Sequence, residues 1–315
     1  MKLPEPCHQI GIVGCGLIGT SWAALFVASG RNVFAWDPSP QAREGASGRV
    51  ASLLAQLQTL ALFPMKKPGN FAVSEDLSSV VQQAFFIQES APEQIAIKHQ
   101  LYRDIERVAT PYTIIASSTS SFCWPELFSE ALHPERCITA HPFNPPHLIP
   151  LVEIYGPSAE VVRNASDVYR SMGRIPVNLK KPAIGHIANR LASALWREAV
   201  NMVAEDIAGV EDIDAALVHG PGLRWSTVGA HMAYHLGGGP GGIEHYLKHL
   251  GPSQERRWSD LGNPRLTPEV CKLIVAGVTR EADGRSIAAL EEERDGNLIA
   301  ILKSRQLSHH GQNQP

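Results

Sequence analysis

The sequence predicts an α/β N-terminal domain with a mainly parallel sheet, followed by an all-α C-terminal domain. Near the N-terminus, a strand, a helix and a second strand follow one another in "HQIGIVGCG", "LIGTSWAALFVASG" and "RNVFAWD". Such a βαβ unit implies parallel strands. From His186 onward the chain shows helical periodicity and no convincing strand. We therefore expect residues 1–183 to form the first domain, residues 184–308 the second, and residues 309–315 a disordered tail.

The remaining elements of the first domain follow in order along the chain. We expect a long helix in "QAREGASGRVASLLAQLQTLALF", and then a turn in "KKPGNF". The later strands are "AFFIQES", "TIIASS", "RCITAH", "LIPLVEIY" and "RIPVNL". Helices are expected between them in "EQIAIKHQLYRDIERVA", "WPELFSEAL" and "AEVVRNASDVYRSMG". The second domain contains helical stretches from "HIANRLASALWREAVNMVAEDI" to "SIAALEEERDGNLIAILKSRQ".

Composition narrows the class of protein. The 315 residues are 44% hydrophobic and 19% charged, as in soluble globular proteins. A net charge of -3 and the lack of a long basic run favour a small-molecule partner over nucleic acid. The five scattered cysteines form no CxxC pair, and no apolar run resembles a signal core or a membrane span. We expect a cytoplasmic protein with reduced thiols and no contact with a membrane.

A glycine-rich loop joins the first strand to the first helix. "GCGLIG" matches GxGxxG in the βαβ context that gives this pattern its meaning. Gly14 permits a tight turn, Gly16 lets backbone amides approach a pyrophosphate, and Gly19 allows close packing. Asp37 ends the second strand, where its carboxylate can accept hydrogen bonds from a ribose diol and would repel a 2′-phosphate.

This loop predicts a Rossmann-type fold that binds NAD rather than NADP. A flavin site, another nucleotide site and a packing turn are the alternatives. The residues that we assign to this part of the cofactor site are Gly14, Gly16, Leu17, Ile18, Gly19 and Asp37.

A histidine and a glutamate are candidates for a catalytic pair. His141 follows the strand "CITA", at the edge of a parallel sheet where ligands bind. Glu153 lies in the apolar run "LIPLVEIY", where a carboxylate is costly to bury unless it is paired. A histidine that needs orienting would supply that partner. The alternative is a structural histidine beside an ordinary buried strand.

Five motifs in order resemble the L-3-hydroxyacyl-CoA dehydrogenase superfamily over nearly the whole chain: "GIVGCGLIG", "QESAPEQIAIK", "SSTSS", "HPFNPP…LVEI" and "GHIANRL". The resemblance implies that His141 is the general acid/base and that Glu153 orients it. It places the hydroxyl-binding serine at Ser120 and the substrate-side asparagine at Asn189. It further implies contacts to the cofactor ribose from Glu93 and Lys98, a position beside the nicotinamide for Asn144, and a homodimer formed through the helical domain.

The chemistry of alcohol oxidation agrees with these implied roles. A base must take the hydroxyl proton while hydride leaves the carbon, and histidine suits this because its pKa lies near neutral pH. A carboxylate bonded to the other ring nitrogen would fix the tautomer. Ser120 and Asn189 can donate to the developing oxygen charge.

The substrate is expected to be a small free L-3-hydroxy acid rather than a CoA ester. The helix after the second strand carries one arginine in "GRVASLLAQLQTLALF" and no lysine until Lys66–Lys67, which suits a multiply anionic CoA poorly. The chain resembles the free-acid branch of the superfamily more than the acyl-CoA enzymes. This resemblance implies L-carnitine as the leading substrate. L-Gulonate and an acyl-CoA remain alternatives, as does a crystallin-like protein that binds NAD without turnover.

Several residues are candidates for direct contacts to the substrate. Arg190 or Arg224 could pair with a substrate carboxylate, although ordinary ion pairs explain them equally well. We expect no metal: His231–His235 and His245–His249 have helical spacing but no third ligand. An aromatic cage for a quaternary ammonium, weighed against ordinary core packing, would be built from Phe143, Trp196, Trp225, Tyr234 and Trp258.

Overall fold

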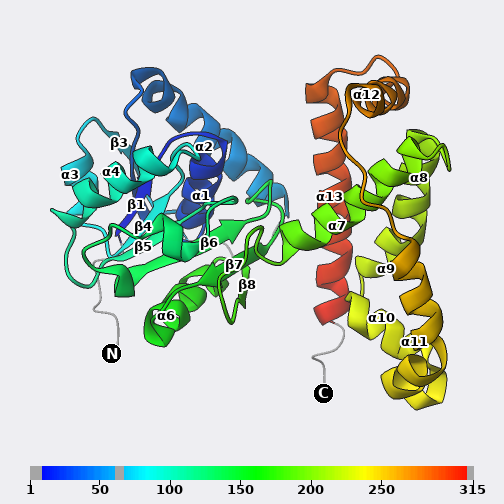
Figure 1. Ribbon diagram of the computed structural model, residues 1–315. Coiled ribbons are helices and arrows are strands. Elements are labelled where there is room, and N and C mark those ends of the chain that lie inside the picture. The colour runs from blue at the N-terminus through cyan, green and yellow to red at the C-terminus, as the bar shows by residue number, and fades with distance from the viewer. Residues whose placement is uncertain (1–8, 61–66, 311–315) are drawn as a thin grey trace. The chain divides into compact units, whose positions relative to one another are not determined.

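The computed structural model describes residues 9–60 and 67–310. The described chain divides into two compact units (Figure 1). The first contains the residues up to Arg190 together with those from Asp295 onward, and the second is Leu191–Arg294. Each unit is described by itself below.

The first unit is built on one sheet of eight strands in the order β3-β2-β1-β4-β5-β6-β7-β8. Strands β1 to β6 are parallel, β7 is antiparallel to β6, and β8 is parallel to β7. The predicted, mainly parallel sheet is therefore confirmed. The strands are β1 (Gln9–Val13), β2 (Asn32–Trp36), β3 (Phe71–Ser74), β4 (Phe86–Glu89), β5 (Ile114–Ser117), β6 (Cys137–Pro142), β7 (Leu151–Tyr155) and β8 (Ile175–Asn178).

Helices cover both faces of this sheet, as two separate apolar cores show. The core on one face includes α1 (Leu17–Ala28), α2 (Pro40–Leu60) and α6 (Ala159–Arg170). The core on the other includes α3 (Leu77–Val81), α4 (Ile95–Glu106) and α5 (Trp124–Leu127). Alternation along the strands produces this division: in β1, Ile10 and Ile12 belong to the first core and Val13 to the second.

Helix α1 is buried almost along its whole length, which fits its apolar sequence. Every residue from Gly19 to Ala28 is buried. The ring of Trp22 packs against Tyr169 of α6, with ring centroids 5.2 Å apart, and Phe26 packs against Phe86 of β4. The glycine loop that begins α1 is thus held on a rigid element.

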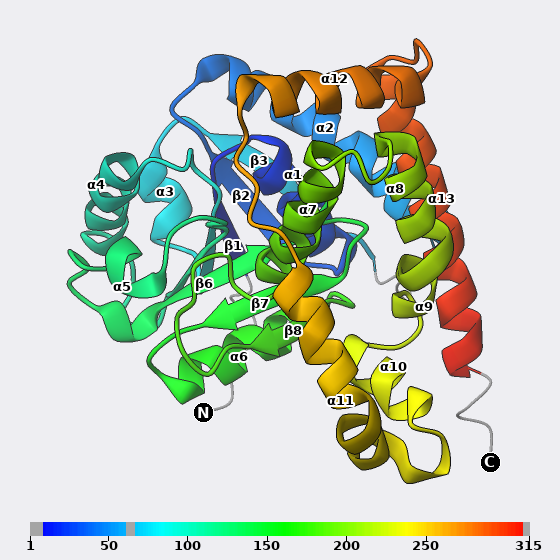
Figure 2. The same ribbon diagram turned by 45° about the vertical axis from the view of Figure 1, so that its right-hand side comes forward.

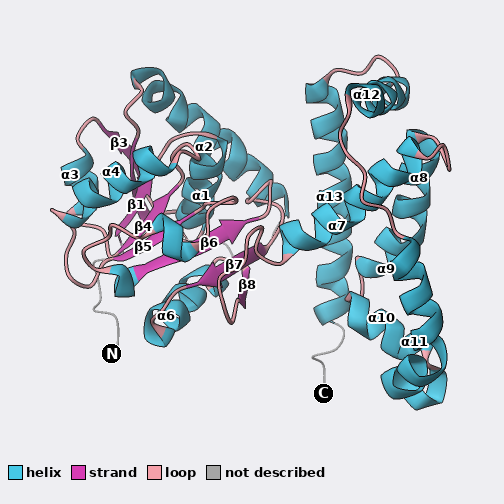
Figure 3. Ribbon diagram, viewed as in Figure 1, coloured by secondary structure: helices cyan, strands magenta, loops and turns pink. Residues whose placement is uncertain are grey.

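The second unit is helical, and its described residues contain no strand (Figures 2 and 3). Helix α7 begins in the first unit and continues into the second, and α13 begins in the second and ends in the first. Among the described helices, none is long and apolar enough to cross a bilayer. The helices are α7 (Ala188–Ala204), α8 (Val210–Leu217), α9 (Leu223–Trp225), α10 (Ala230–Gly237), α11 (Gly242–Asp260), α12 (Pro268–Ala282) and α13 (Ile287–His310), with a short π turn at Val218–Gly222 and a short 3₁₀ turn at Gly239–Gly241. A further 3₁₀ turn, Pro134–Arg136, belongs to the first unit.

The structure differs from the sequence prediction in some elements. Strand β3 and helix α3 were not predicted, and the helix expected in "WPELFSEAL" covers only Trp124–Leu127. Elements of four or five residues carry too little periodicity to be recognised. The predicted end of the helix α2 at residues 61–63 lies outside the described residues.

The compact units also divide the chain differently from the expected domains. The division falls after Arg190, and the end of α13 belongs to the first unit. There Leu298, Ile299 and Leu302 pack against the core that contains α1 and α2. Of the tail expected at residues 309–315, the first two residues are the end of α13, and residues 311–315 lie outside the description.

Candidate active site

The loop from β1 to α1 has the geometry that a dinucleotide requires. Gly14 has φ of 101°, and a Cβ added there would lie 2.6 Å from the Ser90 carbonyl oxygen. A Cβ at Gly19 would lie 1.8 Å from the Gly14 carbonyl oxygen, so neither position accepts a side chain. At Gly16, in contrast, a Cβ would meet no described atom within 4 Å. The open backbone at the start of α1 can receive an anionic ligand.

Asp37 lies directly after β2 and faces this loop. Its Oδ2 accepts a hydrogen bond from the Cys15 N–H at 2.8 Å, and its Oδ1 accepts one from the Ser39 N–H at 2.9 Å. Two backbone donors therefore orient the carboxylate beside the glycine loop. The open start of α1 and this oriented carboxylate fit the pyrophosphate and ribose of NAD.

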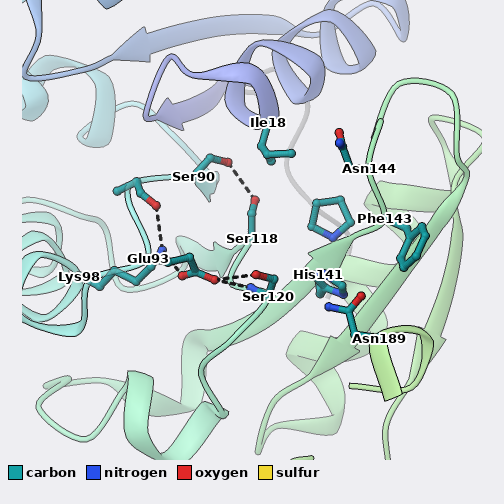
Figure 4. Close-up of a pocket in the computed structure, with 12 residues that line it drawn as sticks. Ile18, Ser90, Glu93, Lys98, Ser118, Ser120, His141, Phe143, Asn144 and Asn189 are labelled. Atoms are coloured by element: carbon teal, nitrogen blue, oxygen red, sulfur yellow. Dashed lines mark hydrogen bonds and ion pairs between the residues drawn. The ribbon is translucent and has the colours of Figure 1, made fainter. Parts of the chain in front are cut away.

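A pocket of about 390 Å³ lies at the carboxyl ends of β4, β5 and β6 (Figure 4). It brings together seven residues assigned from the sequence, from segments far apart in the chain. Among them, Ser120, His141 and Asn189 gather on one side in Figure 4. The pocket-lining residues are Ile18, Ser90, Ala91, Glu93, Lys98, Ser118, Ser120, His141, Pro142, Phe143, Asn144 and Asn189.

His141 and Glu153 form the predicted pair. They are directly opposite each other across the antiparallel β6–β7 ladder, and His141 Nδ1 lies 2.9 Å from Glu153 Oε2. A carboxylate accepts, so Nδ1 carries the proton and the Nε2 lone pair is available as a base. Both side chains are buried, at 4% and 1% exposure.

The start of helix α7 holds the other oxygen of Glu153. Its Oε1 accepts hydrogen bonds from the N–H groups of Ile187 at 2.7 Å and Ala188 at 2.9 Å. Burial alone would raise the pKa of Glu153, but the hydrogen bonds from His141, Ala188 and Ile187 outweigh burial and lower it. The carboxylate stays ionised, and it ties strands β6 and β7, which bear the pair, to the start of the helix that bears Asn189.

Glu93 holds the turn that carries Ser120. Its Oε1 accepts hydrogen bonds from the Ser120 N–H at 2.5 Å, the Ser120 hydroxyl at 3.1 Å and the Thr119 hydroxyl at 3.0 Å. Burial would raise the pKa of Glu93, yet the charge of Lys98 and these hydrogen bonds lower it. Glu93, which was assigned to the cofactor site, and Ser120, which was assigned to the substrate, are thus in direct contact.

Lys98 has a buried partner that the sequence interpretation missed. Its Nζ lies 2.7 Å from Glu89 Oε1 and 3.4 Å from Glu93 Oε2. The second oxygen of Glu89 accepts hydrogen bonds from the hydroxyls of Tyr102 and Ser117, each at 2.5 Å. Burial and the Glu89 carboxylate raise the pKa of Tyr102, which keeps that phenol protonated as a donor. Glu89 therefore fixes the lysine at the edge of the pocket.

Two serines that line the pocket were also missed. Ser90 follows β4, Ser118 follows β5, and their hydroxyl oxygens lie 2.9 Å apart. Ser118 also receives hydrogen bonds from the side-chain N–H groups of Trp22 at 3.2 Å and Gln88 at 2.8 Å. Their positions at strand ends, like that of His141, were the signal that could have identified them.

The candidate substrate contacts are divided between the units. Phe143 lines the pocket, whereas Trp196, Trp225, Tyr234 and Trp258 lie in the second unit and are exposed. The other candidates are arginines. Arg190 is exposed with its Nη1 3.5 Å from the Ile184 carbonyl oxygen, and Arg224 is exposed on α9. In the described parts of the chain, no three or more His, Cys, Asp or Glu side chains are grouped as metal ligands.

The doubly wound sheet, the glycine loop with Asp37, and the buried His–Glu pair together define a dehydrogenase of the NAD-dependent oxidoreductase class. The model of the 3-hydroxyacyl-CoA dehydrogenase NAD-binding domain matches residues 9–182, and that of the family's C-terminal domain matches residues 185–277. The chain belongs to the 3-hydroxyacyl-CoA dehydrogenase family.

Individual proteins that are similar to this chain include two L-carnitine dehydrogenases. L-Carnitine dehydrogenase of Streptomyces coelicolor is 40% identical over 307 residues, which cover 96% of each chain. L-Carnitine dehydrogenase of Pseudomonas aeruginosa is 41% identical over 305 residues, covering 96% of this chain and 95% of that protein. Among solved structures, an NAD⁺-dependent 5-formyl-3-hydroxy-2-methylpyridine 4-carboxylic acid 5-dehydrogenase is similar with a TM-score of 0.80 and 28% identity. The match covers 93% of this chain and 97% of that one.

Proposed function

We propose that the protein oxidises the 3-hydroxyl of a small L-3-hydroxy acid to the ketone with NAD, and that L-carnitine is its leading substrate. The observation that carries the reaction is the buried His141–Glu153 pair, with His141 lining a pocket shared by Ser120 and Asn189. Carnitine as the substrate is supported by relatives of that name at 40% and 41% identity over nearly the whole chain.

In this reaction His141 Nε2 takes the proton of the substrate hydroxyl. Glu153 keeps Nδ1 protonated and stabilises the imidazolium that forms, because its own pKa is lowered and it stays charged. The Asn189 amide donates a hydrogen bond to the substrate oxygen as negative charge develops there. The Ser120 hydroxyl does the same by turning away from Glu93, which still accepts the Ser120 N–H. NAD, when bound, accepts the hydride from the substrate carbon.

The cofactor would be held by two groups of residues. The glycine loop with the first turn of α1 receives the pyrophosphate, and Asp37 accepts hydrogen bonds from the adenosine ribose. Glu93 and Lys98 would hold the other ribose, and Asn144 would lie beside the nicotinamide. The support for this second group is that all three line the pocket with His141.

The substrate assignment is tested by following NADH formation with four alcohols in separate assays. These are L-carnitine, L-gulonate, L-3-hydroxybutyrate and L-3-hydroxybutyryl-CoA, compared by kcat/KM. We expect carnitine to exceed each of the others at least about tenfold, a difference of about 1.4 kcal/mol in transition-state binding. A preference for the CoA ester would overturn the free-acid assignment. Binding of NADH without turnover of any alcohol would instead indicate a crystallin-like protein.

We also propose a cytoplasmic homodimer formed through the helical unit. The support is a set of apolar side chains on α7 and α12 that are at least half exposed in the single chain: Leu191, Trp196, Leu273, Val275 and Val278. Burial of such side chains stabilises an interface. Light scattering is expected to give twice the chain mass, and replacement of Val275 by glutamate is expected to shift the mass toward the monomer. A wild-type monomer at micromolar concentration would contradict the proposal.

A further inference from the structure

His186 lies directly against His141, although the sequence interpretation gave it no role. The side chain is buried at 3% exposure. Its ring stacks on the His141 ring, with the centroids 4.8 Å apart and the planes inclined by 22°. One face of the proposed base is thus covered by a second imidazole.

The far end of the same ring contacts the turn that carries Ser120. His186 Nε2 lies 3.2 Å from the carbonyl oxygen of Thr119. A carbonyl only accepts, so Nε2 carries the proton and the neutral ring has the Nε2–H tautomer. His186 therefore connects His141 to the turn that positions Ser120.

The backbone at this position is also specialised. His186 has φ of 50° and Gly185 before it has φ of 75°, both in the left-handed region. This conformation is unfavourable for a residue with a side chain. It leads the chain into the N–H groups of Ile187 and Ala188 that hold Glu153. A glycine would adopt this turn with less strain, so the backbone conformation does not explain why a histidine occupies position 186.

The surroundings keep this ring neutral. Burial lowers the pKa of His186, and the neighbouring His141 lowers it further. The Thr119 carbonyl, Glu153 on β7 and Glu93 before α4 act in the opposite direction and only partly offset these effects. The neutral His186 ring therefore adds no charge beside the proposed base, whose Nδ1 contacts the Glu153 carboxylate.

We propose that His186 is a positioning residue that supports the flat face of His141 and, through the Thr119 carbonyl, fixes the Ser120 turn relative to the base. The inference rests on the proposed dehydrogenase reaction. It adds a residue that touches neither substrate nor cofactor but sets the distance between two groups that do.

Two variants separate the two contacts. His186→Phe keeps a flat ring but cannot donate to Thr119, so we expect KM for the hydroxy acid to rise about tenfold with a smaller change in kcat. His186→Gln places an amide N–H near the position of Nε2 but removes the ring, so we expect kcat to fall about 10- to 100-fold with a smaller change in KM. In both variants the Kd for NADH, measured by fluorescence titration, should stay within about twofold.

The matched control is His99→Phe. His99 Nε2 also contacts a backbone carbonyl oxygen, that of Glu126 at 3.0 Å, but His99 does not line the pocket. This control should change neither kcat nor KM. Wild-type kinetics in both His186 variants would overturn the proposal. So would parallel losses in kcat, NADH affinity and Tm, because a purely structural role would produce them.

Two measurements do not depend on turnover and therefore separate failure of this inference from failure of the proposed function. The His141 Cε1–H proton signal should carry a ring-current shift in the wild type and in His186→Phe, and should lose it in His186→Gln. The second measurement is Tm as a function of pH. Because the folded pKa of His186 is lowered from the ordinary 6.5, the unfolded chain binds a proton that the folded chain does not, and stability falls as the pH falls through 6.5.

His186→Phe lacks this titration, so its Tm should fall less than that of the wild type between about pH 7.5 and 5.5. Equal acid sensitivity of the two proteins together with an unchanged ring-current shift in His186→Gln would show that the ring is neither neutral nor stacked, and would overturn the inference even if carnitine is turned over.

Discussion

Replacement of His141 by asparagine is expected to lower kcat about 10³-fold, because the variant lacks the imidazole Nε2 that takes the hydroxyl proton in the proposed reaction. Asparagine keeps a polar group of smaller volume opposite Glu153, so the fold and the Kd for NADH should change little. Stopped-flow measurement of NADH formation, with a fluorescence titration for the Kd, separates the two quantities.

A histidine outside the pocket provides the control for the acid–base role of His141. His133 is exposed, and its Nδ1 lies 3.3 Å from Glu135 Oε1 outside the pocket. His133→Asn should therefore retain wild-type kcat. If His141→Asn loses less than about tenfold in kcat, proton transfer does not depend on this side chain, and the assignment of the base is wrong.

Replacement of Glu153 by glutamine is expected to lower kcat by about 10²- to 10³-fold without removing the base itself. In the wild type, Glu153 Oε2 accepts the Nδ1 proton while Oε1 accepts two backbone N–H groups. In the variant the amide oxygen satisfies the backbone donors, so the amide N–H₂ faces Nδ1. His141 must then accept at Nδ1 and carry its proton on Nε2, which is the wrong tautomer for a base.

Glu106→Gln is the matched control for this variant. Glu106 is also a buried carboxylate that accepts two backbone N–H groups, those of Leu132 and His133, each at 2.8 Å. It does not line the pocket. Its replacement should lower Tm but leave kcat unchanged, whereas Glu153→Gln should lower kcat by much more than stability explains. Equal kcat in the two variants would show that Glu153 only supports the fold.

The sequence predicts the helices and strands whose apolar residues follow a clear helical or strand spacing. The β1–α1–β2 unit is predicted because a short β-branched run, with Ile10, Ile12 and Val13, ends in glycines, and because the segment after it shows helical spacing up to Gly30. Strand β3 is missed because Phe71–Ser74 is a half-buried edge strand of four residues, which is too short to show a period. Its presence depends on pairing with β2, which local sequence does not reveal.

The site is predictable in a similar, partial way. His141 and Glu153 are indicated by local argument, because a charged residue in an apolar strand needs a partner. Ser120 and Asn189 are recognised only through the resemblance of their motifs. His186 is missed because its partner, Thr119, lies 67 positions away and is brought near only by tertiary packing. Glu89 is missed although its partner Lys98 lies only nine positions away.

The cross-strand register of β6 and β7 determines whether a folded molecule is catalytically active. Glu153 is opposite His141 only because the two strands are aligned residue for residue, and side chains alternate between the faces of a sheet. A slip of one residue would turn the carboxylate to the other face and place an apolar neighbour, Val152 or Ile154, opposite the base. Such a molecule would keep its glycine loop, its helices and its cofactor affinity, yet it would be inactive. Turnover per bound cofactor is therefore a measure of folding fidelity, which circular dichroism and cofactor binding would both overlook.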